Sequence, residues 1–409
     1  GREDNADFVI TEIGGTVGDI EGLPFLEAIR QVKKHVGRND CLYIHVTLVP
    51  FVTGAGELKT KPTQHSVKEL RSLGIQPDIL ICRSAQPIPQ DMCEKMAMFC
   101  DVDADAVFQN LTARSIYEVP VLLEKQGLDE VVLRKLDVDV TNHPLNMDEW
   151  HDMVERMLKE YDRKVTLGVV GKYVELQDSY ISLTEALRHA AMANEANLEI
   201  KWINAELAET GEVDLEAELK GVDAILVPGG FGDKGLEGKI SAIKYARENK
   251  VPFFGICLGM QCAVVEYARH IGMTDANTTE AKPETTHPVI DIVPEQKDVE
   301  EKGAMRLGLY PCKVAAGSFT EKAYGEALIY ERHRNRYEVN NAFREELEKN
   351  GLVIAGALPN GRLVEIVELP ESVHPWFVGV QFHPELKSRP TNPHPLFRDF
   401  IAAALKEQK

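Results

Sequence analysis

Apolar residues in the first 140 positions follow two alternating patterns. Short continuous runs, typical of buried strands, are separated by stretches in which apolar residues recur every three or four positions, as in amphipathic helices. Strands and helices that alternate along a chain predict a mostly parallel α/β sheet. The strand-like runs lie at residues 7–13, 41–49 and 79–83, and the helical patterns lie at residues 23–36, 64–73 and 90–99.

A second α/β pattern starts at residue 165, after a polar amphipathic stretch. We therefore expect two α/β domains, at residues 1–142 and 165–409, joined by a linker helix at residues 143–164. The strands expected in the second domain lie at residues 165–171, 199–203, 223–228 and 251–256, and they are followed by a surface loop at 272–304, a β-rich section at 287–383 and a helix at 395–406.

Composition narrows the class of protein. The chain has 409 residues, enough for two or three domains, and no apolar run approaches the roughly 20 residues of a membrane-spanning helix. A formal net charge of −19 argues against a broad surface for nucleic acid or anionic membrane. The seven cysteines are scattered, without a Cys-x-x-Cys pair, which argues against zinc and disulfides and favours a reduced, cytosolic protein.

The strongest candidate for chemistry is a cysteine between two glycines at a strand-to-helix junction. Cys257 stands in a Gly-Ile-Cys-Leu-Gly run between an apolar strand pattern and a helical pattern. Small neighbours let the backbone turn sharply and present the side chain, as in a nucleophile elbow. The helix N-terminus behind Cys257 favours its thiolate. A buried cysteine at the end of a core strand would give the same local pattern.

Two further stretches supply what a nucleophile needs. His383-Pro-Glu385 follows an expected strand, where α/β sheets place ligand chemistry, and Glu385 can orient the imidazole. Gly229 and Gly230 follow the strand at 223–228 and can turn backbone N–H groups into a cavity. Taken alone, each stretch is also typical of an ordinary surface turn.

Together, the three stretches resemble the class I, triad-type glutamine amidotransferases over residues 165–405. The shared order is Pro-Gly-Gly, then Gly-x-Cys-x-Gly-x-Gln, then Phe-His-Pro-Glu. The resemblance implies that Cys257 attacks the carboxamide of glutamine, that His383 acts as base and then acid, and that Glu385 orients His383. It also implies oxyanion-stabilising N–H groups at Gly230 and Leu258, and glutamine-binding residues at Gly230, Gln261, Glu280 and Arg336.

Motifs in the N-terminal half resemble the synthetase domain of the CTP synthase family. The similarity continues in the second half and so spans nearly the whole chain, which implies a P-loop-NTPase-like synthetase domain, incomplete here, and a class I amidotransferase domain. The motifs are Glu12-Ile-Gly-Gly-Thr-Val-Gly-Asp-Ile-Glu21, Leu23-Pro-Phe-Leu-Glu-Ala-Ile-Arg-Gln, Leu58-Lys-Thr-Lys-Pro-Thr-Gln-His-Ser-Val-Lys-Glu-Leu, Tyr330-Glu-Arg-His-Arg-Asn-Arg336 and Leu386-Lys-Ser-Arg-Pro.

This resemblance implies one overall reaction. ATP phosphorylates O4 of UTP, ammonia from glutamine displaces the phosphate, and CTP, ADP and phosphate result. From the residues themselves, Glu12 at the end of an expected strand can hold Mg²⁺. Lys59 and Lys61 form a basic spot at a helix start, although surface lysines are more often simply solvated.

The resemblance also assigns the nucleotide pocket. Glu21, Lys95 and Phe99 would line the part in which product CTP inhibits, and Phe99 would stack on the cytosine ring. The residues implied to bind UTP or CTP are Asp19, Glu21, Lys59, Thr60, Lys61, Pro62, Thr63, Gln64, Lys95 and Phe99.

Regulation and assembly are implied as well. GTP would activate at the loop 232–238, where Lys234 stands in place of the arginine expected for the family. A lysine keeps the charge but loses the planar fork, so we expect weaker activation by GTP. A homotetramer, possible assembly into filaments, and no nucleic-acid or membrane partner complete these expectations.

The sequence departs from the family pattern at its start. No Gly-x-x-x-x-Gly-Lys-Ser/Thr phosphate loop occurs in the chain, and no strand pattern precedes residues 7–13. We therefore expect a fragment, and we expect residues 1–409 alone not to form CTP, even from free ammonium.

Two alternatives remain open. An amidotransferase with another acceptor, such as a purine or amino-acid precursor, would share the triad but not the Lys-Thr-Lys-Pro-Thr-Gln run. A structural or regulatory protein on the same fold would need none of Cys257, His383 and Glu385. UTP binding discriminates against the first alternative, and ammonia release from glutamine discriminates against the second.

Overall fold

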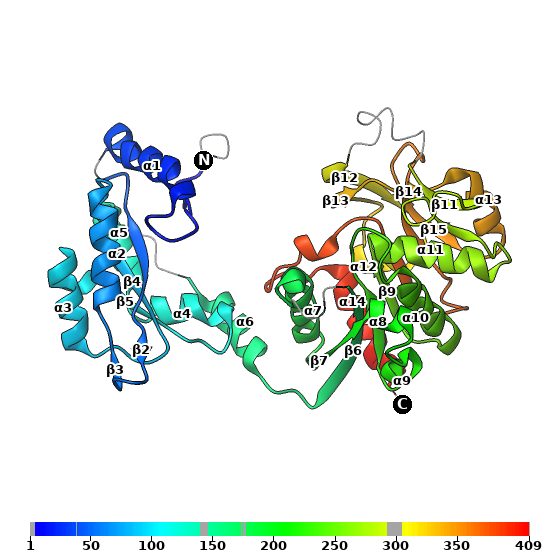
Figure 1. Ribbon diagram of the computed structural model, residues 1–409, viewed down its shortest axis with the longest axis horizontal. Coiled ribbons are helices and arrows are strands. Elements are labelled where there is room, and N and C mark those ends of the chain that lie inside the picture. Colours follow the sequence, from blue (N-terminus) through cyan, green and yellow to red (C-terminus); the bar gives the residue numbers. More distant parts are fainter. Residues whose placement is uncertain are drawn as a thin grey trace. The chain divides into compact units, whose positions relative to one another are not determined.

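The computed structural model describes residues 5–37, 39–139, 146–172, 174, 177–292 and 305–408. The chain divides into two compact units, Gly1–Leu158 and Lys159–Lys409 (Figure 1). Each unit has its own sheet and its own core, and each is described by itself.

Short strands and helices alternate along the first unit. They are η1 (Ile20–Gly22), α1 (Leu23–Val36), β1 (Ile44–Leu48), β2 (Phe51–Val52), β3 (Glu57–Leu58), α2 (Lys61–Ser72), β4 (Ile79–Ser84), α3 (Gln90–Cys100), η2 (Ala104–Ala106), β5 (Val107–Leu111), η3 (Ile116–Glu118), α4 (Val119–Glu124), α5 (Leu128–Lys135) and α6 (Asp148–Leu158). Strands β1, β4 and β5 form a parallel sheet in that order. Val67 of α2 and Met96 of α3 pack with Leu80 of β4, and Val131 of α5 packs with Phe108 of β5.

Most elements predicted for this unit are confirmed, but one strand is wrong. Residues 7–13 form neither helix nor strand, and Phe8 and Ile10 are exposed. An apolar run becomes a strand only where a neighbouring strand completes its hydrogen bonds. None of the described strands pairs with this run. Glu12 therefore does not stand at the end of a strand.

The stretch predicted as a linker contains α6, which packs against other residues of the first unit. The indole nitrogen of Trp150 donates to the carbonyl oxygen of Tyr117 at 2.9 Å, and the two rings meet edge to face. Nε2 of His151 lies 2.5 Å from a carboxylate oxygen of Glu124. Residues 140–145, at the start of this stretch, lie outside the described residues.

The second unit is built on a nine-stranded mixed sheet with the order β13-β12-β15-β16-β17-β9-β8-β6-β7. Strands β17, β9, β8, β6 and β7 are parallel, and the other strands extend the sheet in antiparallel fashion. The strands are β6 (Arg163–Gly171), β7 (Ala196–Asn204), β8 (Ala224–Val227), β9 (Phe253–Ile256), β10 (Ala276–Thr278), β11 (His287–Asp291), β12 (Arg306–Val314), β13 (Leu328–Asn335), β14 (Glu338–Val339), β15 (Val353–Ala357), β16 (Val364–Glu368) and β17 (Phe377–Val380).

Helices cover both faces of this sheet, as Figure 1 shows. On one face, Leu187 and Phe400 pack with Phe254, and on the other face, Ile243 and Val264 pack with the sheet. The expected α/β class is therefore confirmed. The helices are η4 (Gln177–Tyr180), α7 (Ile181–Ala193), α8 (Ala205–Thr210), α9 (Leu215–Leu219), α10 (Leu236–Asn249), α11 (Leu258–His270), α12 (Phe319–Tyr324), α13 (Asn341–Lys349), η6 (Pro384–Leu386) and α14 (Pro395–Glu407).

The surface loop predicted at residues 272–304 is only partly correct. Strands β10 and β11 lie within it and form a small sheet with β14. Strand β10 is short, and its pairing partner is not visible in a local pattern, so the prediction missed it, whereas β11 falls within the β-rich section predicted from residue 287. Residues 293–304 lie outside the described residues.

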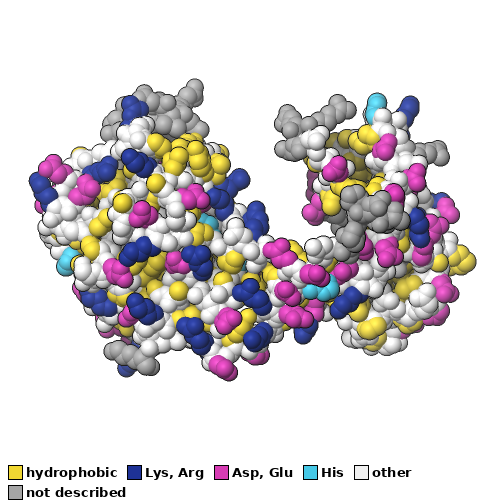
Figure 2. All heavy atoms as spheres, turned by 180° about the vertical axis from the view of Figure 1, so that it is seen from behind, with side chains coloured by type: hydrophobic (Ala, Val, Ile, Leu, Met, Phe, Trp, Pro, Cys, Tyr) yellow, Lys and Arg dark blue, Asp and Glu magenta, His cyan; other side chains and the backbone are white. Residues whose placement is uncertain are grey.

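Acidic and basic side chains are interspersed over the face shown in Figure 2. Within the described ranges, no helix combines the length and apolar character needed to cross a membrane.

Candidate active site

Cys257 lies in the sharp turn between β9 and α11. Its φ of 51° and ψ of −104° fall outside the regions that L-residues usually occupy. Two glycines allow the start of α11 to pack closely against the ends of β8 and β9. A Cβ on Gly259 would overlap the carbonyl oxygen of Val227, and a Cβ on Gly255 would lie 2.8 Å from the backbone of Gly259. The turn therefore fixes the cysteine at the carboxyl edge of the parallel strands.

The turn is tied to the strand that leads to His383. Strands β17 and β9 pair in parallel as far as Val380 and Ile256, and the N–H of Cys257 donates to the carbonyl oxygen of Val380 at 2.7 Å. A Cβ on Gly229, which follows β8, would lie 2.9 Å from Cε1 of His383 and 3.4 Å from Cβ of Cys257. The imidazole and the cysteine therefore lie side by side next to one glycine.

Glu385 orients the imidazole, because its Oε1 atom lies 2.8 Å from Nδ1 of His383. Burial lowers the pKa of His383, but the neighbouring Cys257 and the hydrogen bond and charge of Glu385 outweigh burial and raise this pKa to about 10. Nε2 of His383 has no hydrogen-bond partner within range among the described residues. We therefore attribute the influence of Cys257 to proximity and charge, and we expect His383 to be protonated at neutral pH.

Gly230 and Leu258 lie next to each other beside this pair. A Cβ on Gly230 would lie 3.5 Å from Cδ2 of Leu258, which is the first residue of α11. The first N–H groups of a helix have no partner within the helix. The buried Lys239 lies close by, with Nζ 3.9 Å from the same Cβ position, and burial lowers its pKa. This arrangement suits the stabilisation of an oxyanion.

Arg336 and Glu280, both predicted to bind glutamine, gather near Tyr337. Burial raises the pKa of Tyr337, the charge of Glu280 raises it further, and the charge of Arg336 lowers it. Oε1 of Glu280 also accepts from the N–H of Gly232 at 3.1 Å, which ties the loop after Gly230 to the turn that follows β10. The structure therefore brings these two charged groups to one place.

Gln261 is buried in the first turns of α11. Its Nε2 atom donates to the carbonyl oxygen of Tyr337 at 3.0 Å and to Oε1 of Gln381 at 3.1 Å. The amide nitrogen is thus engaged within the protein, which leaves the carbonyl oxygen for the predicted contact with glutamine. Gln381, which is fully buried directly after β17, was missed by the sequence-based prediction. A polar residue at the end of an apolar strand is the signal that points to it.

The first unit gathers several residues predicted to bind UTP at the start of α2. Lys61 and Pro62 are exposed in its first turn. Thr63 is buried and donates to a carbonyl oxygen of β1 at 3.2 Å, so its hydroxyl anchors the helix. Nε2 of Gln64 donates to Oγ1 of the buried Thr60 at 3.3 Å. Lys61, Pro62 and Gln64 thus remain the members of this run best placed to meet a ligand.

Lys59 and Lys95 lie near one carboxylate. Lys59 forms an ion pair with Glu57, and its hydrogen bond and charge lower the pKa of Glu57, as the charge of Lys95 also does. Phe99, one turn further along α3, is 55 % exposed, so its ring is available for stacking. The charges of both predicted lysines therefore act on the same carboxylate.

The acidic residues predicted near the nucleotide lie in and beside the loop before α1. Oδ2 of Asp19 accepts from the N–H of Thr16 at 2.9 Å, whereas Glu12 and Glu21 are exposed. No group of three or more His, Cys, Asp or Glu side chains in the described part of the chain is arranged to hold a metal. A Mg²⁺ ion at Glu12 would therefore take its other ligands from nucleotide phosphates and water.

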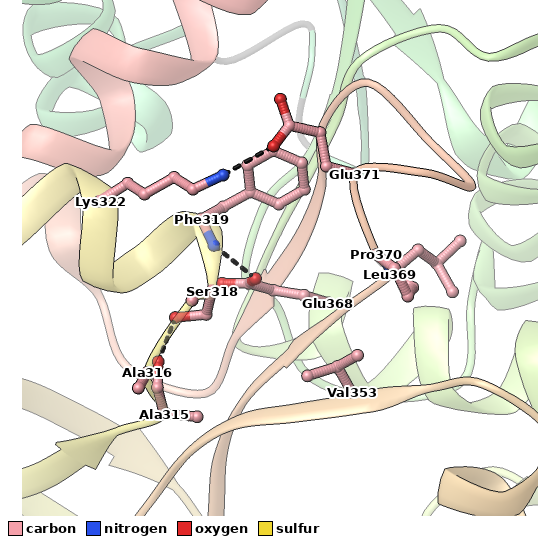
Figure 3. Close-up of a pocket in the computed structure, with 11 residues that line it drawn as sticks. Ala315, Ala316, Ser318, Phe319, Lys322, Val353, Glu368, Leu369, Pro370 and Glu371 are labelled. Carbon is pink, nitrogen blue, oxygen red and sulfur yellow. Dashed lines mark hydrogen bonds and ion pairs between the residues drawn. The ribbon is translucent and has the colours of Figure 1, made fainter.

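A separate hollow lies between α12 and the end of β16 (Figure 3). The buried carboxylate of Glu368 accepts from the N–H of Phe319 at 2.8 Å, and Lys322 pairs with Glu371 at 2.6 Å. Glu368 pairs with Val378 at the start of β17, so this hollow lies at the opposite end of that strand from His383. Its charged groups are satisfied within the protein, so they do not indicate a ligand.

Comparison with known proteins gives matches over both units. The family model described as CTP synthase N-terminus matches residues 1–138, and the model described as glutamine amidotransferase class-I matches residues 175–403. A CTP synthase of Carboxydothermus hydrogenoformans is 59% identical over 410 residues, which cover 100% of this chain and 75% of the relative. A CTP synthase of Bacillus velezensis is 56% identical over 413 residues, which cover 100% of this chain and 76% of the relative.

A solved structure is similar as well. It is the glutaminase domain of Trypanosoma brucei CTPS with bound acivicin, which is 39% identical. The match has a TM-score of 0.55 and covers 60% of this chain and 95% of that chain.

Proposed function

This chain belongs to the CTP synthase family, and on that premise we propose that Cys257, His383 and Glu385 are the reacting groups of its glutaminase. Members of the family are glutamine-hydrolysing ligases, and ATP and UTP are their substrates. The observation that carries the proposal is the strained Cys257 beside an imidazole held by Glu385. The direct test is release of ammonia and glutamate in equal amounts when the purified chain is given glutamine.

The reaction starts from the thiolate of Cys257 beside the protonated His383. The sulfur attacks the amide carbon of glutamine, an S–C bond forms, and the carbonyl electrons move onto oxygen, which the N–H groups of Gly230 and Leu258 stabilise. His383 gives its Nε2 proton to the amide nitrogen. The C–N bond then breaks, ammonia leaves, and a thioester remains on Cys257.

Hydrolysis of the thioester returns the site to its starting state. The neutral His383 takes a proton from water, and the resulting hydroxide adds to the thioester carbon. The same two N–H groups stabilise the second oxyanion. Its collapse breaks the C–S bond and releases glutamate, and the thiolate of Cys257 again faces a protonated His383.

We place the α-carboxylate of glutamine on Arg336, because a guanidinium matches a carboxylate with two parallel hydrogen bonds. Glu280, which lies in the same neighbourhood, suits the α-ammonium group. The free carbonyl oxygen of Gln261 completes the polar contacts. This division leaves the carboxamide end of the substrate for Cys257.

Replacing Arg336 with alanine should raise KM for glutamine about 10- to 100-fold, because a hydrogen bond to a charged group contributes about 1.5–3 kcal/mol. The value of kcat should change little, because the α-carboxylate is gripped equally in the ground and transition states. Steady-state ammonia release measures both constants. Arg344→Ala on α13 is the matched control and should leave both unchanged. An unaltered KM in Arg336→Ala would remove this residue from the glutamine site.

In the first unit, we propose that Lys59, Lys61, Gln64 and Lys95 hold UTP, and that Phe99 stacks on the base of inhibitory CTP. Three of these side chains are cationic and three lie at or beside the first turn of α2, whose N-terminus favours phosphate. Mg²⁺ would bridge the nucleotide phosphates and Glu12 and neutralise their charge. The remaining residues predicted for this pocket, Asp19, Glu21, Thr60, Pro62 and Thr63, would shape or anchor it.

We also propose that GTP activates at the loop containing Lys234, which is exposed. Lys234→Arg should lower the GTP concentration for half-maximal activation about fivefold, because a guanidinium offers a second hydrogen bond to phosphate, worth about 1 kcal/mol. The measurement is glutamine hydrolysis titrated with GTP. The exposed Lys244→Arg on α10 controls for the general effect of arginine. An unchanged GTP titration would argue against contact between residue 234 and GTP.

A further inference from the structure

Within the described part of the chain, the sulfur of Cys257 has two polar contacts besides the nearby imidazole. The carbonyl oxygen of Arg334 lies 3.9 Å from Sγ and can accept from the protonated thiol. Nε2 of Gln381 lies 3.7 Å from Sγ on another side. The two contacts favour opposite protonation states, because a carbonyl oxygen can only accept a hydrogen bond and an amide N–H group can only donate one.

The orientation of the Gln381 amide follows from its neighbours. The carbonyl oxygen of Tyr337 can only accept, so the atom of Gln261 that faces it must be the amide nitrogen. That nitrogen also faces the Gln381 side chain at 3.1 Å, so the atom of Gln381 at this contact must be its oxygen. The amide nitrogen of Gln381 is then the atom that faces the sulfur of Cys257.

We propose that Gln381 is a further catalytic residue, which donates a hydrogen bond to the Cys257 sulfur and stabilises the thiolate before attack. The inference rests on the proposed role of Cys257 as the nucleophile. A hydrogen bond to a charged acceptor is about twice as strong as one between neutral groups, so the donor gains strength when the thiol ionises. Without the hydrogen bond from Gln381, the carbonyl oxygen of Arg334 would favour the protonated thiol of Cys257.

Gln381 is held firmly enough for this role. It is fully buried, and its own N–H donates to the carbonyl oxygen of Glu365 at 2.8 Å. Among the described residues, two ionisable side chains feel the charge of Cys257. They are His383, whose positive charge favours the thiolate, and Cys262 of α11, whose pKa burial raises to about 12, so it stays neutral. The Cys257 sulfur therefore has one charged partner, His383, and Gln381 adds a neutral hydrogen-bond donor.

The test is the rate at which iodoacetamide alkylates Cys257 in the whole chain at pH 7 and at pH 9.5. Gln381→Met keeps the length of the side chain but removes the donor, so the rate at pH 7 should fall about tenfold. A pH of 9.5 lies above the pKa of an ordinary thiol, about 8.5, so the donor should matter little there and the rate should stay within about twofold of the original. Gln381→Glu places a carboxylate beside the sulfur and should lower the rate at pH 7 further.

A merely structural role would lower the rate at both pH values, so an equal loss at pH 7 and pH 9.5 overturns the proposal, as does an unchanged rate at pH 7. Gln261→Met provides a second variant, should neither replacement at 381 fold. It keeps the donor but removes the group that orients it, and it should reduce the rate at pH 7 about threefold. An unchanged rate in this variant also counts against the proposal.

The controls separate this inference from the proposed function. Alkylation of Cys257→Ala measures the background from the other cysteines. Ammonia release that survives in Cys257→Ala would refute the nucleophile itself. An unaltered pH dependence of alkylation in the Gln381 variants, with Cys257 still essential for ammonia release, would refute only the role of Gln381.

Discussion

Replacing Cys257 with alanine should reduce ammonia release from glutamine about 10⁴-fold or more, because Cys257 is the group that we propose forms the thioester. Removal of a triad nucleophile typically leaves only the rate that binding and the oxyanion site supply. Alanine fits the turn between Gly255 and Gly259 and adopts the same backbone, so thermal stability should change by less than about 1 kcal/mol. Ammonia release and thermal unfolding of the purified variant measure the two effects.

Cys262→Ala is the matched control for this variant. Cys262 lies on the same helix, is buried, and has a pKa that burial raises to about 12, so its thiol is inert at neutral pH. The Cys262→Ala variant should therefore keep nearly full activity in ammonia release. If Cys262→Ala lost activity as completely as Cys257→Ala at unchanged stability, the assignment of the nucleophile would fail.

Replacing Arg306 with methionine should lower the stability of the second unit by about 3–5 kcal/mol, which corresponds to roughly 10 °C in Tm. Arg306 is 2% exposed and pairs with Glu338 at 2.7 Å and with Glu365 at 2.8 Å. Its loss would leave the buried carboxylate of Glu338 without its cation, and the buried carboxylate of Glu365 with His333 as its remaining charged partner. The thermal unfolding transition of the second unit, compared between the variant and the original chain, measures this loss of stability.

The pKa values show how closely this network is balanced. Burial raises the pKa of Glu338, whereas Glu365, buried as deeply, has a lowered pKa because the charges and hydrogen bonds of His333 and Arg306 outweigh burial. Without Arg306, the amide of Asn335, at 2.8 Å, is the remaining side-chain partner of Glu338 among the described residues. The double variant Arg306→Met/Glu338→Gln should therefore recover part of the lost Tm, because it removes the carboxylate that the loss of Arg306 would leave without a cation.

An exposed ion pair supplies the comparison. Lys349 and Glu345 lie 2.9 Å apart on α13 with both side chains largely exposed, so Lys349→Met should cost no more than about 0.5 kcal/mol. A loss of Tm in Arg306→Met as small as that in Lys349→Met would show that the buried network contributes little to stability.

Local patterns were sufficient to predict the turn that holds Cys257, whereas its combination with Gly230 and His383 was predicted from the family resemblance. The spacing of Gly255, Cys257 and Gly259 predicts a sharp turn because only small residues permit the approach of α11 to Val227, and that approach is present in the structure. The elements on which the site depends, β8, β9, β17 and α11, follow in the same way from apolar runs and helical spacing. Such features depend on residues close in sequence.

Features that depend on distant partners were not predictable in this way. The run at 7–13 has strand-like composition, but composition does not supply a neighbouring strand. The orientation of the Gln381 amide depends on Gln261 and on the carbonyl oxygen of Tyr337, which only the folded chain brings together. The buried pairs of Arg306 likewise join residues on three different strands or their ends.

The strand order of the large sheet has a consequence for folding. Strand β17 is the last strand of this sheet along the chain, yet it lies inside the sheet between β16 and β9. Contacts between residues far apart in sequence form late, because a long loop must close first. During folding, Cys257 therefore has no base beside it until β17 has inserted. Glutaminase activity would then report the completion of folding, and a partly folded second unit would expose an unpaired thiol instead.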